Sequence, residues 1–288
     1  MNIGVVGGGS VGLLLSSYLS INHQTTLYVR RDKQRNDLLS YGVTRDQQMK
    51  LVDVLMYTDM KKEDLIIVCV KQPDVKQLIP YILNENRHTP ILFLQNGMGH
   101  LDIIKQLKQP VLIGVVEHGA YRVNDFTVSH TGKGVIKLAL LKGEKSMLHK
   151  IYDELHTEEY PFDIYHHWEK ILTEKLIVNA VINPLTALFN VKNGHILTNR
   201  FMNYIAHQLC IETAHVLGLN PDEEWERVQY IAQTTSENIS SMLKDIRAKR
   251  PTEIDAISGY VLNQKNSYQK PYTTFVYHSI KALEIRGD

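Results

Sequence analysis

A glycine-rich segment directly after the first apolar run constrains most strongly what this chain can fold into. The run Ile3–Val6 is followed by Gly7, Gly8, Gly9, Ser10, Val11 and Gly12, and then by the apolar stretch Leu13–Leu19. In a G-x-G-x-x-G segment between a strand and a helix, the glycines permit a tight turn, a close backbone approach to a pyrophosphate and close helix–strand packing. The sequence therefore predicts that residues 7–12 bind a dinucleotide, although an isolated glycine string also occurs as a plain turn.

Short, continuous apolar runs alternate with amphipathic or polar segments through the first half of the chain. The runs lie at Ile3–Val6, Thr26–Val29, Leu65–Val70, Ile91–Leu94 and Val111–Val116. This alternation is typical of a doubly wound parallel sheet, so we expect an α/β fold with an N-terminal Rossmann-type domain. Two further runs, Thr127–His130 and Val135–Leu140, flank Gly132 and Gly134 and predict a hairpin that closes this domain.

From Trp168 onward the apolar residues recur with helical spacing. Helices are predicted over about 168–183, 199–217, 222–247 and 252–264. The C-terminal domain should therefore be all-α, and the predicted domains are 1–165 and 166–288. Between the second and third helices, Gly218 is expected to end one helix, and Asn220, Pro221 and Asp222 are expected to begin the next.

Composition argues against several classes of function. The chain has 288 residues, with 32 Lys and Arg against 31 Asp and Glu, so no overall basic field favours nucleic acid or an anionic membrane. Its longest apolar runs are far shorter than the roughly 18 residues of a membrane helix, and no signal region precedes the first strand. Cys69 and Cys210 are far apart, and the histidines show no metal-ligand spacing. We expect a cytoplasmic protein without a metal site.

The end of the second predicted strand indicates which dinucleotide binds. In NAD-binding folds an acidic residue about 20 positions beyond the glycines binds the adenosine ribose. Here Arg30 and Arg31 occupy this region, and guanidinium groups suit a 2′-phosphate better than a neutral hydroxyl. The sequence therefore favours NADPH over NADH. The alternatives are that both arginines form a solvated strand end and that Asp32 serves the ribose.

The first predicted helix of the second domain carries a polar stripe. Lys175, Asn179 and Asn183 are spaced i, i+4, i+8, so they lie along one face of the helix. The apolar residues Leu176, Ile177, Ala180 and Val181 can face the core. An ammonium and two amides on such an apolar helix suggest a ligand. The alternatives are a solvent-exposed face, or a helix cap formed by Asn183 before Pro184.

A second polar cluster follows near residue 240. Asn238 and Ser241 are spaced i, i+3 within the predicted helix 222–247, so both can face one pocket. Pro251 is expected to stop that helix, and Thr252 to cap the next one, which would place Glu253 in its first turn. Capping alone is sufficient to explain an acidic residue at this position.

Together these motifs resemble the ketopantoate reductases, or 2-dehydropantoate 2-reductases, over most of the chain. The matching segments are Gly7-x-Gly9-x-x-Gly12, Val70-Lys71, Gln95-Asn96-Gly97-Met98-Gly99, Glu174–Ala187 with its Lys-x-x-x-Asn-x-x-x-Asn-Pro pattern, Asn193-Gly194, Glu237–Met242 and Arg250–Asp255. The helix pattern and the last two segments are far more specific than the glycines. The resemblance implies reduction of 2-dehydropantoate to (R)-pantoate by NADPH, a step toward pantothenate and coenzyme A.

The resemblance also implies roles for individual residues. Lys175 would be the general acid, with Glu253 and Asn96 as the other catalytic residues. Asn96 and Lys71 would also contact the cofactor, together with the glycine loop and Arg30 or Arg31. The substrate would be bound by Lys175, Asn179, Asn183, Asn193, Asn238, Ser241 and Glu253.

Other functions are compatible with the same motifs. A related NADP-dependent reductase of another 2-oxo acid, or a 3-hydroxyacid dehydrogenase, would share the architecture and a catalytic lysine. A non-catalytic NADPH sensor would bind the cofactor but would not need the stripe at Lys175. A homodimer is possible, since apolar helices can cover a partner's core as well as their own.

Overall fold

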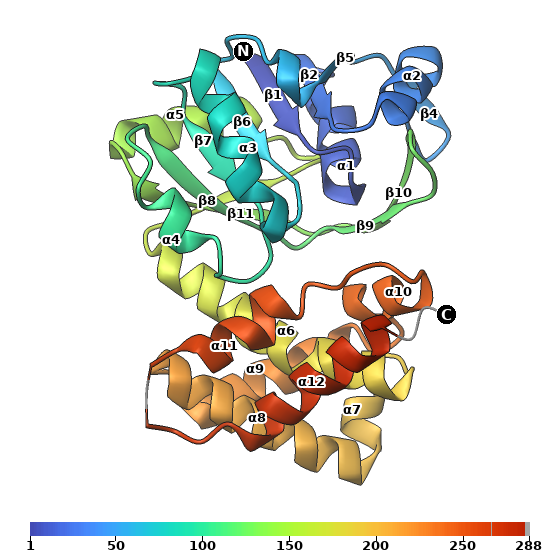
Figure 1. Cartoon of the computed structure of the whole chain (residues 1–288), viewed down its shortest axis with the longest axis vertical. Coiled ribbons are helices and arrows are strands. Elements are labelled where there is room, and N and C mark those ends of the chain that lie inside the picture. Colours follow the sequence, from blue (N-terminus) through green and yellow to red (C-terminus); the bar gives the residue numbers. More distant parts are fainter. Residues whose placement is uncertain (266, 286–288) are drawn as a thin grey trace. The chain divides into compact units, whose positions relative to one another are not determined.

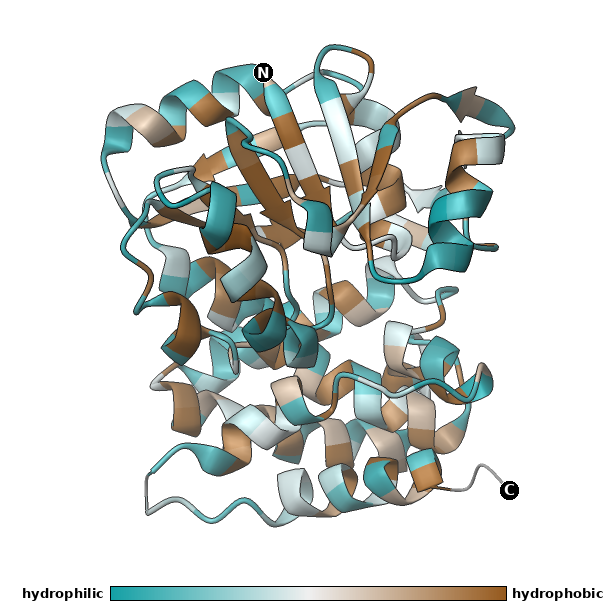
Figure 2. Cartoon of the chain, turned by 45° about the horizontal axis from the view of Figure 1, so that its top comes forward, coloured by the Kyte–Doolittle hydropathy of each residue, from teal (hydrophilic) through white to brown (hydrophobic). Residues whose placement is uncertain are grey.

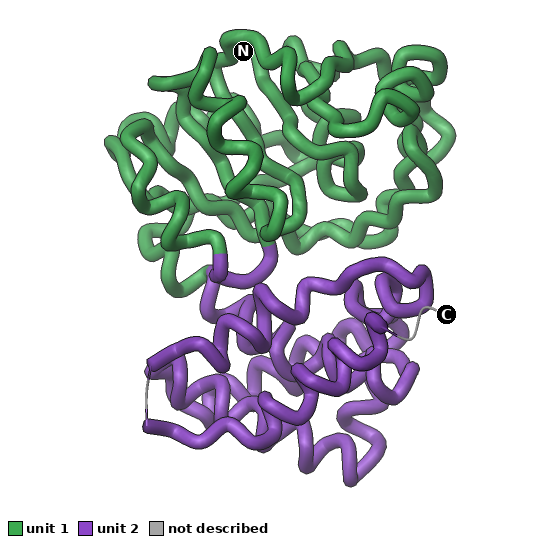
Figure 3. Tube along the Cα trace, in the orientation of Figure 1, with its two compact units in different colours: residues 1–95, 100–171 green, residues 96–99, 172–288 purple. Residues whose placement is uncertain are grey.

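The computed structural model describes residues 1–265 and 267–285. The chain divides into two compact units, which Figure 3 shows in different colours. The first unit contains residues 1–95 and 100–171, and the second contains residues 96–99 together with the chain from Leu172. A short segment from the middle of the sequence therefore belongs to the C-terminal unit. The domain limits expected from the sequence, 1–165 and 166–288, stay a prediction.

The first unit is built on an eight-stranded sheet with the order β12-β11-β8-β7-β6-β1-β2-β5 (Figure 1). Its strands are β1 (Asn2–Val6), β2 (Gln24–Val29), β5 (Asp53–Met56), β6 (Leu65–Val68), β7 (Ile91–Phe93), β8 (Val111–Val116), β11 (Ile136–Lys142) and β12 (Phe162–Tyr165). All neighbours are parallel except β11 and β8. The doubly wound parallel sheet is thus confirmed.

A second, four-stranded sheet has the order β4-β3-β10-β9. Its strands are β3 (Val43–Arg45), β4 (Gln48–Lys50), β9 (Gly119–Arg122) and β10 (Thr127–Gly132). The helices of this unit are α1 (Ser10–Leu19), α2 (Asp32–Tyr41), α3 (Gln72–Glu85), α4 (Leu101–Ile104) and α5 (Lys145–Leu155), and a 3₁₀ turn covers Tyr57–Asp59. Helix α1 contacts both sheets.

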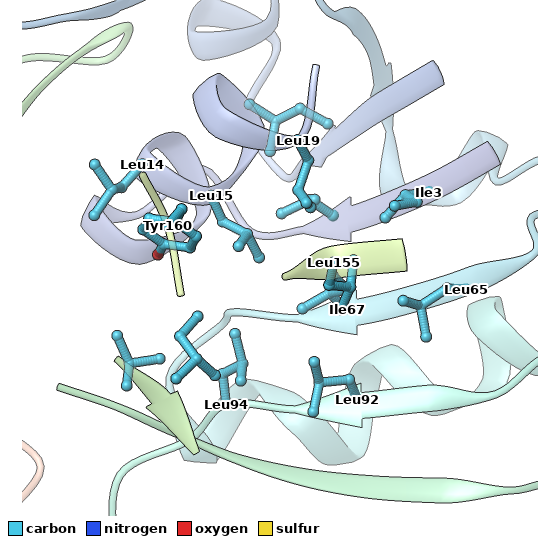
Figure 4. Close-up of a cluster of buried hydrophobic side chains, with 14 of the residues drawn as sticks. Ile3, Leu14, Leu15, Leu19, Leu65, Ile67, Leu92, Leu94, Leu155 and Tyr160 are labelled. Carbon is cyan, nitrogen blue, oxygen red and sulfur yellow. The ribbon is translucent and has the colours of Figure 1, made fainter. Parts of the chain in front are cut away.

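The core of the first unit lies where α1 packs on the large sheet. Leu14, Leu15 and Leu19 of α1 share one buried cluster with Ile67 of β6 and Tyr160 (Figure 4). Figure 2 shows that hydrophobic residues dominate several strands of the large sheet, whereas the outer helices alternate hydrophilic and hydrophobic residues. The continuous apolar runs in the sequence therefore correspond to strands covered on both faces.

The predicted hairpin between Thr127–His130 and Val135–Leu140 is wrong, because the two segments lie in different sheets. The first lies in β10, which pairs with β9 and β3, and the second forms β11, which pairs with β8 and β12. The backbone at Gly134 passes against another segment, since an added Cβ there would lie 2.5 Å from the carbonyl oxygen of Glu117. This glycine serves a close approach between chain segments instead of a hairpin turn.

In the second unit every described element is helical, which confirms the all-α prediction. The elements are α6 (Trp168–Phe189), α7 (His195–Thr198), α8 (Arg200–Leu217), α9 (Pro221–Thr234), α10 (Ser241–Arg247), a π-helical turn (Asp255–Gly259), α11 (Tyr260–Asn263) and α12 (Pro271–Ile285). Residues of α6, α7, α8, α9 and α12 form its core. The boundary between α8 and α9 is as expected: Gly218 is left-handed with φ 68°, and the side chain of Asn220 accepts a hydrogen bond from the Asp222 N–H.

The predicted helix 222–247 is interrupted between α9 and α10. The carbonyl oxygens of Ser236 and Asn238 accept hydrogen bonds from the N–H groups of Gly194 and Asn193, both at 3.0 Å. These carbonyls therefore pair with another segment instead of continuing the helix. Ser240 then caps α10, because its side chain accepts from the Leu243 N–H at 3.1 Å.

Helix α6 is long and apolar enough to cross a membrane by length and composition, but 67% of its apolar window is buried inside the protein. This is the environment of a core helix. The polar residues Lys175, Asn179 and Asn183 interrupt the apolar sequence of α6, so no uninterrupted apolar run of membrane length occurs in it.

Candidate active site

The glycine loop connects β1 to α1. Gly7, Gly9 and Gly12 are each suited to this loop for a different physical reason. Gly7 has φ +115°, a conformation that L side chains rarely adopt, and a Cβ on Gly12 would lie 1.8 Å from the carbonyl oxygen of Gly7. At Gly9, by contrast, no described residue other than its immediate chain neighbours has a heavy atom within 4 Å of an added Cβ. Gly7 and Gly12 are thus required by the fold, whereas Gly9 leaves open space where a ligand could approach the backbone.

The start of α1 suits an anion. The first N–H groups of an α-helix have no partner within it, and here they belong to Ser10, Val11 and Gly12. The first turn contains no acidic residue, and the N-cap Gly9 has no side chain to bind these N–H groups. The open space at Gly9 and the N–H groups at the positive end of the α1 helix dipole together fit the pyrophosphate of a dinucleotide.

The other predicted cofactor residues of this unit lie at the same edge of the sheet. Strands β1, β2 and β6 are parallel and in register, so their carboxyl ends meet there. Arg30 and Arg31 follow β2, and Lys71 follows β6 as the N-cap residue of α3. Arg30 pairs with Asp74 at 3.1 Å with both groups exposed, an arrangement that contributes little to stability.

Contacts near Gly8 were not predicted. The side chains of Gln34 and Arg122 both donate to the Gly8 carbonyl oxygen, at 2.7 and 3.4 Å. Arg122 also lies 3.5 Å from the carboxylate of Asp125, which forms an ion pair with Arg31. The Arg122–Gly8 and Arg31–Asp125 contacts join residues 114 and 94 positions apart, and the Gln34–Gly8 contact joins residues 26 positions apart. None of them leaves a periodic signal in the sequence.

The polar stripe of α6 is present as predicted. Lys175 and Asn179 are half-buried, and Asn183 is only 7% exposed. The residues expected in the core, Leu176, Ile177, Ala180 and Val181, are all buried. The alternative that Asn183 caps the helix is wrong, because α6 continues through Pro184 to Phe189.

Asn96 and Glu253 are in direct contact within the second unit. The amide nitrogen Nδ2 of Asn96 donates to Oε2 of Glu253 at 2.8 Å. The contact depends on Gly97, which has φ +77° and whose added Cβ would lie 2.2 Å from the carbonyl oxygen of Ala256. The structure therefore brings together two residues that sequence reasoning assigned to the same site from segments 157 positions apart.

Thr252 fixes the start of the turn that carries Glu253. Its Oγ1 accepts from the Ile254 N–H at 3.2 Å, as the predicted cap requires. Its own N–H and hydroxyl both donate to the Glu284 carboxylate at 2.7 Å. The first turn after Thr252 is π-helical, beginning at Asp255, instead of the expected α-helix.

The other predicted substrate residues differ in their surroundings. Asn238 and Ser241 are exposed but do not share a helix, since Asn238 lies in the loop before α10; that part of the prediction is wrong. Asn193 is 8% exposed, and its Nδ2 donates to Thr235 Oγ1 at 2.9 Å. Asn193 thus binds the loop that carries Asn238. Among the described residues, no group of three His, Cys, Asp or Glu could hold a metal ion.

Two family models match the chain. The model described as ketopantoate reductase PanE/ApbA matches residues 3–143, and the model of the C-terminal part of the same family matches residues 167–284. A 2-dehydropantoate 2-reductase of Bacillus subtilis is 40% identical, with 99% of this chain and 98% of that protein covered. One from Listeria monocytogenes is 34% identical, with 100% and 98% covered. The chain belongs to the ketopantoate reductase family.

Solved structures agree with this membership. A probable 2-dehydropantoate 2-reductase of Bacillus subtilis has a TM-score of 0.89 at 38% identity, with 98% of this chain and 100% of that chain covered. A D-mandelate dehydrogenase solved with NADH and anilino(oxo)acetate has a TM-score of 0.92, with 99% and 98% covered. At 21% identity the latter shows a common fold only.

Proposed function

We propose that this chain catalyses the NADPH-dependent reduction of 2-dehydropantoate to (R)-pantoate in pantothenate and coenzyme A biosynthesis. Full-length relatives of that activity at 34–40% identity support the reaction. The observation that carries the substrate assignment is the hydrogen bond between Asn96 and Glu253. A fixed carboxylate offers an acceptor for the substrate's primary hydroxyl, and a simple 2-oxo acid has no group to use it.

The residues of the first unit fit NADPH, which supplies the hydride when bound. Backbone N–H groups of the loop Gly7–Gly12 would hold the pyrophosphate, and Lys71 and Asn96 would contact other parts of the cofactor. Arg30 and Arg31 would recognise the 2′-phosphate, because guanidinium groups form charge-assisted hydrogen bonds with phosphate oxygens.

Lys175 is the proposed general acid. When the carbonyl carbon accepts a hydride, its oxygen gains negative charge, which a nearby ammonium stabilises and then neutralises by donating a proton. Asn179 and Asn183, on the same stripe, would line the pocket. Asn193, Asn238 and Ser241 would bind the substrate at or near its carboxylate.

The test of this mechanism is Lys175→Ala. We expect kcat to fall on the order of 10²- to 10⁴-fold, the range for loss of a general acid, with an unchanged circular dichroism spectrum. Lys170→Ala is the control, since Lys170 lies exposed on the same helix. Near-normal turnover of Lys175→Ala would disprove the assignment.

The substrate assignment needs a separate experiment. We expect NADPH oxidation to be far faster with 2-dehydropantoate than with 2-oxo acids that lack the hydroxyl. In Glu253→Gln this preference should shrink, because the hydroxyl loses its anionic acceptor. An equal preference in both proteins would mean that Glu253 does not read the hydroxyl.

We also propose a cytoplasmic homodimer. The support is a ketopantoate reductase of Staphylococcus aureus that is described as dimeric, with a TM-score of 0.83 at 23% identity. Light scattering of the purified protein tests the assembly, and a mass of one chain at micromolar concentration would contradict it.

A further inference from the structure

Helix α2 buries a single amide against the glycine loop. Gln34 is 4% exposed, and its Nε2 donates to two backbone carbonyl oxygens, Gly8 O at 2.7 Å and Asp125 O at 2.9 Å. Both N–H bonds of one amide are therefore used to join two loops. Burial of such a group is unfavourable unless these hydrogen bonds form.

The position of the Gly8 carbonyl is closely defined. An added Cβ on Gly8 would lie 2.5 Å from Gln34 Nε2, so the loop backbone is in contact with this side chain. Because the Gly8 oxygen accepts from Gln34, it is directed at α2. A carbonyl oxygen directed at a phosphate would repel it, so this arrangement leaves the N–H groups at the start of α1 as the groups that face an anion.

Gln34 also lies at a junction of charged groups. Arg31 is the N-cap residue of α2, and its guanidinium pairs with the carboxylate of Asp125, whose backbone oxygen accepts from Gln34. One amide thereby ties the glycine loop to the segment between β9 and β10, and the Arg31–Asp125 ion pair ties that segment to the start of α2.

We propose that Gln34 is a positioning residue for dinucleotide binding: it holds the Gly8 carbonyl away from the pyrophosphate and keeps the loop in its binding conformation. A loop that is ordered before binding loses less entropy when the ligand arrives. The inference rests on the proposed cofactor role of residues 7–12. Because NADPH and NADH share the pyrophosphate, loss of Gln34 weakens both to the same extent, whereas loss of a 2′-phosphate contact weakens NADPH alone.

The experiment is a fluorescence titration of the purified protein with NADPH and with NADH, without substrate. Gln34→Met keeps the approximate volume and removes both donors, and we expect each Kd to rise about tenfold, which corresponds to about 1.4 kcal/mol. Gln34→Asn keeps an amide on a shorter side chain and should give a smaller rise. In steady-state assays with saturating NADPH, kcat and the KM for 2-dehydropantoate should stay within about twofold of the native values.

Gln109→Met is the matched control. Gln109 is also 4% exposed, but its Nε2 has no hydrogen-bond partner in the described chain. It precedes β8, at the sheet edge opposite the glycine loop. This variant should leave both Kd values unchanged, while thermal unfolding of all variants measures stability separately.

Three results would overturn the proposal: unchanged Kd values in a folded Gln34→Met, a loss confined to NADPH, or an equal loss in Gln109→Met. If Gln34→Met does not fold, Gln34→Asn decides by the same criteria. The proposed reaction is tested separately from the role of Gln34. It would be disproved if the native protein bound both dinucleotides but did not turn over 2-dehydropantoate.

Discussion

Arg30 and Arg31 are adjacent in sequence but pair with different carboxylates. Arg30 contacts Asp74 near the start of α3, and Arg31 contacts Asp125 between β9 and β10. A 2′-phosphate would have to compete with these carboxylates for the guanidinium groups. Both side chains of the Arg30–Asp74 pair are exposed, so this ion pair is weak enough to be exchanged for a phosphate. Asp125 is only 15% exposed, so Arg31 is held more firmly than Arg30.

Replacement of both arginines by alanine tests how the 2′-phosphate is recognised. In Arg30→Ala/Arg31→Ala we expect the KM for NADPH to rise about tenfold or more, since a hydrogen bond to a charged group contributes about 1.5–3 kcal/mol. The KM for NADH should change little. Lys33→Ala, an exposed cation on α2, is the control. Equal increases for both cofactors would show that the phosphate is bound elsewhere.

Local residue patterns point to one part of the candidate site but not to another. The glycine loop and the stripe at Lys175 follow from spacing within one element. The contacts of Gln34 with Gly8 and of Asn193 with Thr235 join distant segments. The sequence contains no periodicity that indicates such pairs, so they could not be predicted from it.

At the level of elements, helix ends with their own chemistry were predicted better than pairings. The end of α8 at Gly218 and the start of α9 after Asn220 depend on residues next to them. The predictions of the hairpin and of the continuous helix 222–247 were wrong. The strands that pair with β10 and β11, and the loop that pairs with residues 235–240, lie far away in sequence. Apolar periodicity gives the type of an element but not its neighbours.

The packing of α1 on β1 predicts opposite behaviour for two glycines of one loop. Gly12→Ala should lower the free energy of unfolding by about 1–3 kcal/mol or more, since its Cβ meets the Gly7 carbonyl oxygen and the helix must shift. Gly9→Ala should fold with nearly native stability but bind NADPH weakly, because its Cβ enters the open space. Urea unfolding and cofactor titration of both variants check this, and a strongly destabilised Gly9→Ala would contradict it.

For the whole molecule, the fold class was predictable because both halves have strong apolar patterns.

A polar cluster inside the first unit could not be predicted from the sequence. His118 Nδ1 lies 3.1 Å from His130 Nε2, and the ring of His118 stacks on Tyr160 at 4.2 Å. Tyr18 Oη lies 2.9 Å from His130 Nδ1, and the Arg45 guanidinium lies over the Tyr18 ring. A second positive charge in this cluster is unfavourable.

This cluster predicts that stability depends on pH. Burial, with the neighbouring His130, lowers the pKa of His118 to about 4, and burial alone does the same for His100. Unfolded histidines titrate near pH 6.5, so the unfolded state binds more protons between pH 6.5 and 4. The free energy of unfolding should therefore be highest above pH 6.5. It should fall as the pH decreases from 6.5 toward 4, by about 2 kcal/mol or more.

Urea unfolding at pH 7.5 and pH 5 measures this fall. In His118→Phe, which keeps a ring to stack on Tyr160, the difference between the two pH values should be smaller than in the native protein. His149→Phe is the control, since His149 is an exposed residue of α5. An unchanged pH dependence in His118→Phe would mean that other groups cause the fall.

The assignment of residues 96–99 to the second unit has a consequence for how such chains can be recombined. The backbone passes between the units after residue 95, before residue 100 and again at residue 171. A chimera that joins this nucleotide-binding half to a foreign helical half at residue 171 would therefore keep a tetrapeptide fitted to the original Glu253–Ala256 turn. Exchange of the halves requires that Asn96, Gly97, Met98 and Gly99 be transplanted together with the helices.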